Sequence, residues 1–461
     1  MSQAANPKGS RNVTWPQWVA GTGVAILMLQ PGMMSSWSSP YIPWLISPDS
    51  PIPVTMTEMS WVVSLLNLGR IFGAVAGSLC VNYLGSKTSI MFTLVAATLT
   101  WTFTVVANDV AWLYASRFFG GITLGMTFSC FSLYLGEIAS SNIRGALVAL
   151  GVTGITFGNF VMSIMGAYLS LKVSGTISLL LALLLLLLFI WLPESPHHYI
   201  RKKMDEKAKS SILWYHPDCD VESEYLALRK FIEDLSKQPI LVTLKEFKLP
   251  HYRHSLLIIL IILMLTQMSG LNNISFYLES ILTRANVKTI APSQAVIIMM
   301  GSAIVGSVLS MFLMDTCGRK FLICISSSGV ALSLCLLSTA FHLIDYGVDP
   351  KVTEALAIFS GVLFFMMAFM GMFTVPPTVL GELFPPHQKC IVAFFASSSS
   401  GFFSFVATST YLPLLEVFTD KYLYFLFAFV TFLTVPYTIL FVPETKGLSL
   451  QEIQSKLVNK K

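Results

Sequence analysis

The stretch SLLLALLLLLLFIWL, Ser178 to Leu192, contains no charged residue and consists almost entirely of aliphatic and aromatic side chains. A bilayer core about 30 Å thick is crossed by a helix of about 20 apolar residues. This stretch therefore predicts a membrane-spanning helix. The rest of the chain agrees, because 54% of its 461 residues are hydrophobic and only 11% are charged, whereas soluble domains carry about 25% charged residues.

Further apolar windows lie on both sides of this stretch, and together they predict an all-α membrane protein with twelve transmembrane helices. We expect spans at residues 16–36, 58–81, 88–107, 111–135, 145–170, 175–193, 254–282, 292–314, 321–343, 355–381, 391–415 and 422–442. One long hydrophilic stretch separates the sixth span from the seventh. The predicted organisation is an N-terminal six-helix bundle (1–193), a cytoplasmic linker with short helices (194–253), a C-terminal six-helix bundle (254–443) and a cytoplasmic tail (444–461).

The positions of lysine and arginine indicate the orientation in the membrane. With the N-terminus inside, the short cytoplasmic segments hold more of these residues, such as Lys87, Arg319 and Lys320, than the exterior loops do. Cytoplasmic loops are enriched in Lys and Arg. Both termini and the linker are therefore expected in the cytoplasm. The expected location of this multi-pass protein is the plasma membrane, with an intracellular membrane as the alternative.

Three motifs of the first half recur in the second half in the same order. They are NYLGSK (82–87) with DTCGRK (315–320), Glu137 and Arg144 with Glu382 and Lys389, and Pro193-Glu194-Ser195 with Pro443-Glu444-Thr445. The second half thus repeats the first in the same membrane orientation. Two parallel six-helix halves are the architecture of the major facilitator transporters, in which the substrate site lies between the halves near the middle of the bilayer.

The repeated charges all fall at the predicted cytoplasmic ends of helices. Acids and cations placed there can pair when the two halves meet on the inside and separate when they part. The predicted cytoplasmic gate consists of Glu137, Arg144, Glu194, Asp315, Arg319, Glu382, Lys389 and Glu444. The alternative is that these residues are helix caps and topology signals. In the first half Asn82 and Ser86 stand where the second half has Asp315 and Arg319, so we expect a network that is stronger around the second half.

The chain resembles the sugar porter family of the major facilitator superfamily over essentially its full length, and within it the insect facilitated trehalose and hexose transporters. The matching motifs are GRK at 318–320 with its weaker copy GSK at 85–87, RFFGG at 117–121, Glu137 with Arg144-Gly145, PESP at 193–196, QMSGLNNISFY at 267–277, GELFP at 381–385 and PETKG at 443–447. The resemblance implies a facilitative transporter that moves a hexose such as glucose, or trehalose, by alternating access. It implies a transporter and not an enzyme.

Three amides interrupt the seventh apolar span. Burying an amide without a hydrogen-bond partner costs about 2–7 kcal/mol, so this segment must face something other than lipid. Ser269, Asn272, Asn273, Phe276 and Tyr277 follow helical spacing and share one face. Gln267 falls off that face, and a break at Gly270 would bring it back.

In the sugar porter family the segment that resembles Gln267–Tyr277 lines the sugar site, so these six residues are the predicted substrate-binding residues. Carboxamides both donate and accept hydrogen bonds, as sugar hydroxyls do, and an aromatic ring can pack against the C–H face of a sugar. The alternative is that the amides bond neighbouring helices together.

Several positions depart from the family pattern, and they leave the identity of the sugar or polyol open. Thr266 replaces the first of the usual two glutamines, the run Thr374–Thr378 lacks a tryptophan, and Ser397–Gly401 replaces an Asn-Trp pair. His197 and His198 stand where an arginine is usual. If they carry the gate charge, pairing there would weaken as pH rises through about 6.5; the alternative is two solvated surface histidines.

Energy coupling is predicted from the intramembrane charges. Proton-coupled relatives carry an acid in the first helix near an arginine in the fourth; Arg117 is present, but the first acid in the chain is Asp49, beyond the first helix. A uniporter is therefore preferred, with a proton-coupled sugar or polyol symporter, or a sugar sensor without turnover, as alternatives. Arg70 is also expected at membrane depth, either at the outer mouth of the path or near the interface.

No nucleotide-binding loop or metal-ligand cluster is evident, so we expect no cofactor and no metal. The expected partners are a small-molecule sugar and the lipid bilayer, with no nucleic acid and no obligate protein partner.

Overall fold

The computed structural model describes residues 14–236, 245–384, 388–444 and 446, and in this part of the chain every regular element is a helix. The first six spans are α1 (Trp15–Ser36), α3 (Met56–Leu84), α4 (Ser86–Val106), α5 (Val110–Ile138), α6 (Ser141–Tyr168) and α7 (Leu171–Trp191). A short helix, α2 (Ser38–Ile46), continues α1.

The second six spans include two that are broken. They are α12 (Pro250–Met268) with α13 (Leu271–Arg284), α14 (Pro292–Cys317), α15 (Arg319–Asp345), α16 (Pro350–Met367) with the π-helix η1 (Ala368–Met372) and α17 (Val375–Leu383), and the two halves of α18 (Lys389–Phe441). Thr419 divides α18, because its φ of 58° and ψ of 164° are not helical.

Ten helical stretches of the described chain are long and apolar enough to cross a membrane. One of them, Ile391–Phe441, contains the two spans that meet at Thr419. The remaining span is α1, whose Gln17 and Gln30 are buried and bonded within the protein. The prediction of an all-helical membrane protein with twelve spans is confirmed.

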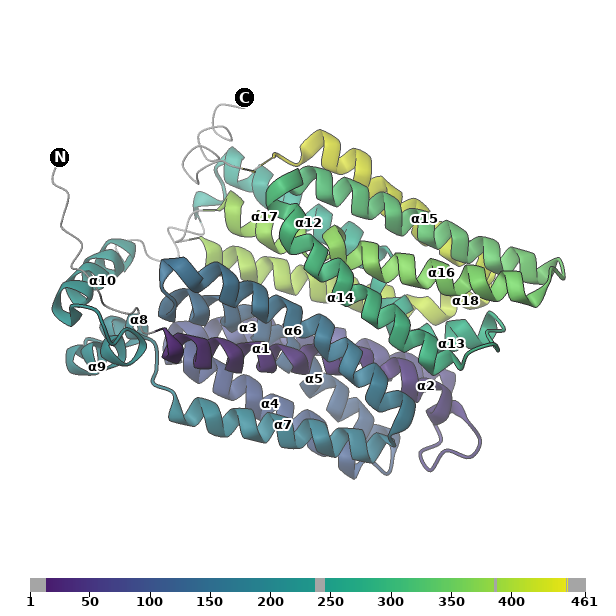
Figure 1. Cartoon of the computed structure of the whole chain (residues 1–461), viewed down its shortest axis with the longest axis horizontal. Coiled ribbons are helices and arrows are strands. Elements are labelled where there is room, and N and C mark those ends of the chain that lie inside the picture. The colour runs from purple at the N-terminus through teal and green to yellow at the C-terminus, as the bar shows by residue number, and fades with distance from the viewer. Residues whose placement is uncertain (1–13, 237–244, 385–387, 445, 447–461) are drawn as a thin grey trace.

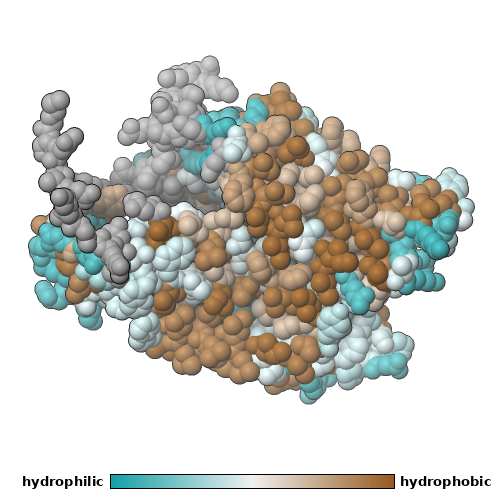
Figure 2. Space-filling model, viewed as in Figure 1, coloured by the Kyte–Doolittle hydropathy of each residue, from teal (hydrophilic) through white to brown (hydrophobic). Residues whose placement is uncertain are grey.

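The surface has the distribution of polarity that a membrane demands. Figure 2 shows hydrophobic residues over the middle of the visible face and hydrophilic residues gathered toward its two ends. Large apolar side chains on the spans are exposed, such as Leu187 at 63% and Phe312 at 68%. A soluble protein would bury such side chains, whereas lipid solvates them.

Three short helices lie at one end of the bundle, which we call the linker end; the opposite end is the far end. These helices are α8 (Pro196–Arg201), α9 (Asp205–Tyr215) and α10 (Val221–Ser236), and they lie at the left of Figure 1. Gln17 of α1 donates to the Tyr215 carbonyl oxygen, and the hydroxyls of Tyr134 and Tyr215 are 2.9 Å apart, so the first six spans hold this group in place.

The two sets of six spans meet through α3 with α18, α6 with α14, and α2 with α13. Two hydrogen bonds cross between the sets in the described chain: Asn67 Nδ2 donates to Thr408 Oγ1 (3.3 Å), and the Glu279 N–H donates to Ser39 Oγ (3.1 Å). Ser39 lies in α2, beyond α1 at the far end. The second of these bonds therefore fastens the two sets together at that end.

Glycines bring α3 and α5 into backbone contact. A Cβ on Gly69 would collide with the Phe118 carbonyl oxygen, and one on Gly121 would collide with the Leu66 carbonyl oxygen. The sequence spacing of Gly69, Gly73 and Gly77 predicts a close-packing face of this kind, and the prediction is confirmed.

The close contact between α3 and α5 can be tested directly with alanine substitutions on α5. Gly121→Ala is expected to lower the free energy of unfolding by about 1–3 kcal/mol, because the added methyl must displace backbone of α3. The matched control is Gly136→Ala on the same helix, where a Cβ meets nothing within 4 Å and where alanine favours the helix. Thermal unfolding of both variants in detergent measures the difference, and equal midpoints would contradict the packing account.

Candidate functional site

The seventh span is broken at Gly270. This residue has a φ of +81°, in the left-handed region that favours glycine, and it separates α12 from α13. A Cβ there would also lie 2.6 Å from the Phe427 ring. The break frees backbone and side-chain polar groups inside the membrane, as discontinuous helices do at transporter binding sites.

The break brings Gln267 and Asn272 together, which the spacing of an unbroken helix would not do. Asn272 Nδ2 donates to Gln267 Oε1 and to Ser404 Oγ, each at 2.6 Å. Neither Asn272 Oδ1 nor Gln267 Nε2 has a hydrogen bond in the described chain, and Asn272 is partly exposed. The three residues, which we call the amide cluster, therefore offer one acceptor and one donor to a hydroxyl-bearing ligand.

Asn273 and Tyr277 lie deeper, toward α18. Asn273 Nδ2 donates to the Ala407 carbonyl oxygen (3.1 Å), and the rings of Tyr277 and Tyr411 stack with centroids 4.9 Å apart. Asn273 Oδ1 and the Tyr277 hydroxyl are buried without a partner in the described chain. Asn273 thus bonds α13 to α18, as the alternative of amides that join neighbouring helices expects. Its Oδ1 is still available as a hydrogen-bond acceptor.

Ser269 and Phe276 do not reach an open surface in this conformation. Ser269 is fully buried and donates to the Thr266 carbonyl oxygen of its own helix (2.7 Å), and Phe276 is 2% exposed. Of the six predicted substrate-binding residues, the structure therefore brings Gln267 and Asn272 into one cluster with a free donor and a free acceptor. The other four, Ser269, Asn273, Phe276 and Tyr277, are buried.

Sequence reasoning missed Ser404. It follows the SSSSG run, and Ser397, Gly401, Ser404 and Thr408 recur at helical spacing along one stripe of α18. That periodicity could have indicated a polar face on α18. It could not have identified the partner of Ser404, because Asn272 lies 132 positions away in sequence.

Arg117, in α5, is satisfied without an acid. Its guanidinium donates to the Met34 carbonyl oxygen (2.7 Å), Ser38 Oγ (2.8 Å) and the Val62 carbonyl oxygen (3.3 Å), and it lies over the Trp37 ring. The described acceptors of Arg117 are thus backbone carbonyl and hydroxyl groups, and none of them is a carboxylate.

Arg70 and Glu279 are the other charges at membrane depth that bear on the site. Arg70 is the central residue of α3 and lies over the Phe128 ring. Glu279, which sequence reasoning did not single out, follows the amide cluster on α13, and its Oε2 is buried without a partner in the described chain. An acid so placed in a span is a signal for function.

At the linker end, Glu194 and Glu444 have matching roles. Glu194 accepts hydrogen bonds from the Lys87 and Thr88 N–H groups at 2.8 and 2.9 Å, and Glu444 accepts from the Arg319 and Lys320 N–H groups at 3.1 Å. Each carboxylate thus caps the first turn of a helix that lies earlier in its own half, α4 for Glu194 and α15 for Glu444.

The glycine before each of these caps is in the left-handed region. Gly85 has a φ of +102° and Gly318 a φ of +92°, and a Cβ on either would press on the capping carboxylate. The repeated GSK, GRK and PE motifs therefore form one turn-and-cap structure, built twice.

Two further clusters at the linker end contain predicted gate residues. Arg319 Nη2 lies 2.9 Å from Glu382 Oε1, a direct ion pair. In the first half Ser86 Oγ donates to Glu137 Oε2 (2.6 Å), and the nearest described cation is Arg201 of α8, 3.6 Å from Glu137 Oε1. The network is stronger in the second half because Ser86 replaces an arginine.

One predicted gate residue, Arg144, does not join these clusters in the described structure. Arg144 is exposed, and its guanidinium donates to the carbonyl oxygen of Ala139 (3.1 Å), the C-cap residue of α5. The side chains of Asp315 and Lys389 lie outside the described residues.

His197 and His198 stand beside Glu137 and Glu194 at the linker end. Burial lowers the pKa of His197, and the neighbouring Glu137 only partly opposes this effect; burial likewise lowers the pKa of His198. The sequence left two hypotheses for these residues, a charged gate pair or two solvated histidines, and the lowered pKa of both rings disfavours the charged pair. Both rings favour the neutral form near pH 7, and Arg201 supplies the cation.

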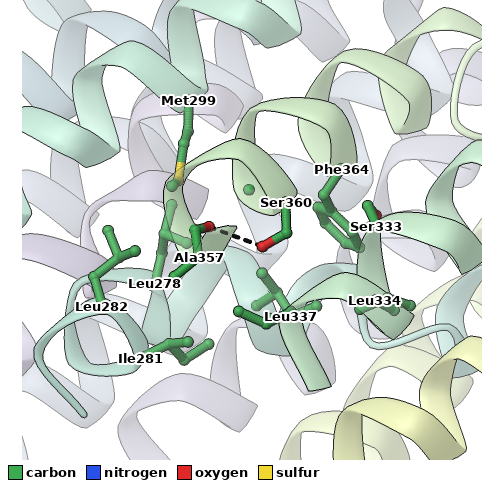
Figure 3. Close-up of a pocket in the computed structure, with 12 residues that line it drawn as sticks. Leu278, Ile281, Leu282, Met299, Ser333, Leu334, Leu337, Ala357, Ser360 and Phe364 are labelled. Carbon is green, nitrogen blue, oxygen red and sulfur yellow. Dashed lines mark hydrogen bonds between the residues drawn. The ribbon is translucent and has the colours of Figure 1, made fainter. Parts of the chain in front are cut away.

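A small closed cavity in the second half is not a sugar site. Its volume is about 10 Å³, barely enough for one water molecule. Figure 3 shows its wall of leucines, Met299 and Phe364, with the Ser360 hydroxyl turned to the Ala357 carbonyl oxygen. The wall lacks free polar groups, so the amide cluster remains the candidate site.

Comparison with known proteins gives a consistent result. A family model described as "Sugar (and other) transporter" matches residues 24–457. The chain is 27% identical to a facilitated trehalose transporter of Drosophila yakuba over 97% of its own length and 52% of the relative's, so it spans about half of that protein. It is 28% identical to sugar transporter ERD6-like 6 of Arabidopsis thaliana, over 94% of this chain and 88% of the relative.

Solved structures share the fold. The proton:xylose symporter XylE bound to 6-bromo-6-deoxy-D-glucose superposes with a TM-score of 0.77 at 19% identity, covering 96% of this chain and 99% of the other. The inward-open form of XylE from E. coli gives a TM-score of 0.76 at 19% identity, covering 95% and 99%. The twelve-helix arrangement in two parallel sets is thus confirmed.

The break in the seventh span can be tested with alanine. Gly270→Ala is expected to lower the free energy of unfolding by about 3 kcal/mol, because it adds backbone strain and a clash with Phe427. Gly347→Ala is the matched control: its φ is +71°, but a Cβ there meets nothing within 4 Å, so it should cost only about 1 kcal/mol of backbone strain. Equal unfolding midpoints for the two variants would contradict the account of the break.

The lowered pKa of His197 and His198 predicts a pH dependence of stability. In the unfolded chain these rings take up protons as pH falls through about 6.5. In the folded chain the same rings are protonated only at lower pH, because their pKa is lowered. Their contribution to stability is therefore present above pH 6.5 and is lost as pH falls. The thermal midpoint in detergent should drop between pH 7.5 and 5.5.

The variant His197→Gln should make this drop smaller, while the exposed control His254→Gln should not change it. A midpoint that rises on acidification, or an unaltered drop in His197→Gln, would refute the assignment.

Proposed function

The chain belongs to the sugar transporter family of the major facilitator superfamily, and from that premise we propose that it is a facilitative sugar uniporter that works by alternating access. It is a multi-pass membrane transporter and not an enzyme. The amide cluster at the break of the seventh span carries the proposal, because it presents a free donor and a free acceptor inside the membrane.

The proposed substrate-binding residues are Gln267, Asn272 and Ser404, supported by Asn273 and by the stacked rings of Tyr277 and Tyr411. A sugar hydroxyl can accept from Gln267 Nε2 and donate to Asn272 Oδ1 at the same time. Since several curated relatives are named trehalose transporters, trehalose and glucose are the substrates to test first.

The proposed moving parts are two bundles, residues 1–193 and 254–443, joined by the cytoplasmic linker 194–253 and followed by the tail 444–461. The bias of Lys and Arg supports a cytoplasmic linker end, and we propose the plasma membrane as the location. The bond between Glu279 and Ser39 at the far end, and the interface of α2 with α13, would then have to open to admit substrate from outside.

Uniport is supported by Arg117, whose described partners are carbonyl and hydroxyl groups. One observation favours a second candidate, proton-coupled symport: the buried, unpartnered carboxylate oxygen of Glu279 lies at the interface that must open. Proton coupling through Glu279 and uniport make opposite predictions for a pH gradient.

Counterflow in liposomes that contain the purified full chain tests the proposal. Labelled glucose and trehalose should exchange in the wild type, and Asn272→Ala should lose at least about tenfold in rate, since it removes the acceptor and leaves Gln267 and Ser404 without their partner. The control Asn108→Ala changes an exposed amide in the turn between α4 and α5 and should exchange normally.

The pH gradient decides the mechanism. Uniport predicts no sugar accumulation with an inward proton gradient, and symport through Glu279 predicts accumulation that Glu279→Gln abolishes. Binding of either sugar without exchange would instead indicate a sensor and would contradict the transport proposal.

A further inference from the structure

Arg70 lies at the centre of the second span and faces the interior of the protein. The exposed side chains of Phe72, Val75 and Leu79, at 54%, 39% and 52% exposure, mark the lipid-facing side of α3. At about 100° per residue, Arg70 lies on the opposite side of the helix. It therefore lies at the middle of the span and points away from the lipid-facing side, and its side chain is partly exposed.

The guanidinium of Arg70 lacks polar partners. Its Cζ lies 5.1 Å from the centre of the Phe128 ring, while Nε is buried without a hydrogen bond. No hydrogen bond or ion pair of Arg70 exists within the described part of the chain. An arginine remains charged, and an unpaired charge at this depth costs several kcal/mol unless it serves a ligand or an aqueous path.

Arg117 shows what a structural arginine in this bundle looks like. Its three nitrogens all donate to protein acceptors, and it is 2% exposed. Arg70 shares the contact with an aromatic ring but has none of the hydrogen bonds. The difference indicates that the partner of Arg70 is not among the described residues of the chain.

The neighbours of Arg70 place it beside the amide cluster. Gly69 packs on α5, and Ile71 packs on Gly401 of α18, so Arg70 points between α5 and α18. Gly401 is one helical turn, about 5 Å, from Ser404 along α18, and Ser404 bonds Asn272. Arg70 and the amide cluster therefore flank the same short section of α18.

Two hydroxyls on the adjoining turn of α18 are also unused. Ser397 Oγ and Ser398 Oγ are buried without a hydrogen-bond partner in the described chain. Ser397 lies on the stripe of α18 that contains Gly401 and Ser404. Hydroxyl and guanidinium donors on facing helices suit an anionic group between them.

We propose that Arg70 binds a carboxylate on the transported solute, so that the protein carries a sugar acid of the hexuronate class. The carboxylate would take paired hydrogen bonds from the guanidinium, while the ring hydroxyls bind the amide cluster. This inference rests on the proposed transport function and deepens it by naming the substrate class.

Charge balance favours a carboxylate over a phosphate ester. The only other described cation in the interior of the first six spans, Arg117, already has its acceptors. One guanidinium neutralises one carboxylate, whereas a phosphate monoester carries about −1.5 to −2 at pH 7 and would leave excess negative charge in the membrane. Uptake of the monoanion by a uniporter would move charge, so an inside-positive potential should accelerate it.

The experiment compares labelled glucuronate and glucose exchange in liposomes that contain the full chain. The wild type should exchange glucuronate, and Arg70→Met should lose about 30-fold or more, the loss typical of removing one partner of a buried charge pair. Glucose exchange by Arg70→Met should stay within about threefold, because a neutral sugar does not use the carboxylate site. Arg70→Lys, which keeps the charge, should retain an intermediate glucuronate rate.

The matched control Arg229→Met removes an exposed arginine of α10 and should leave both rates unchanged. Glucose-6-phosphate is included as a competitor and should inhibit glucuronate exchange less than unlabelled glucuronate does.

Each other outcome has a definite meaning. Wild-type exchange of glucose without glucuronate overturns the sugar-acid inference and leaves the proposed transport function intact. Equal loss of glucose and glucuronate in Arg70→Met assigns Arg70 to the fold or the transport cycle and rejects the anion site. Preference for the phosphate ester rejects the carboxylate assignment, and exchange of none of these solutes, nor of trehalose, rejects the transport function as well.

Discussion

Inside a bilayer there is no water to satisfy a polar group, so any interruption of a helix must be compensated by protein or by ligand. The break at Gly270 is where this constraint matters most. The left-handed glycine ends one helix and begins another within the seventh span, and the groups around it are only partly satisfied by the chain. Gln267, Asn272 and Ser404 bond one another and leave a donor and an acceptor for a solute. The proposed site is thus a consequence of how the backbone passes through the membrane.

The same constraint explains the repeated motifs at the linker end. The reversal before α4 and its counterpart before α15 each combine a left-handed glycine with a carboxylate that caps the helix, and Glu194 and Glu444 supply the carboxylate in the two halves. The copies differ where the second half has Arg319 and the first has Ser86. In the second half Arg319 forms an ion pair with Glu382. In the first half Glu137 accepts a hydrogen bond from the Ser86 hydroxyl and pairs with Arg201 of the linker helix α8. The linker is therefore attached to one half by charge.

Much of this arrangement could be predicted from sequence, because spans, turn glycines and repeats are local patterns. The twelve spans followed from apolar length, and the shared face of Asn272, Asn273 and Tyr277 followed from helical spacing. What could not be predicted are contacts between distant segments. Ser404 as partner of Asn272, the backbone acceptors of Arg117 and the burial of His197 depend on how helices pack. The charge of a residue says nothing about whether its neighbours already satisfy it, and that separates Arg117 from Arg70.

The most direct test of the account is a cryo-electron-microscopy structure of the full chain with its transported sugar at saturating concentration. The account predicts density for the sugar at the break of the seventh span, with ring hydroxyls within hydrogen-bond distance of Gln267 and Asn272 and with α18 alongside. Sugar density elsewhere in the bundle would contradict it, if the hydrogen bond between Gln267 and Asn272 is still present and neither Gln267 Nε2 nor Asn272 Oδ1 contacts the sugar.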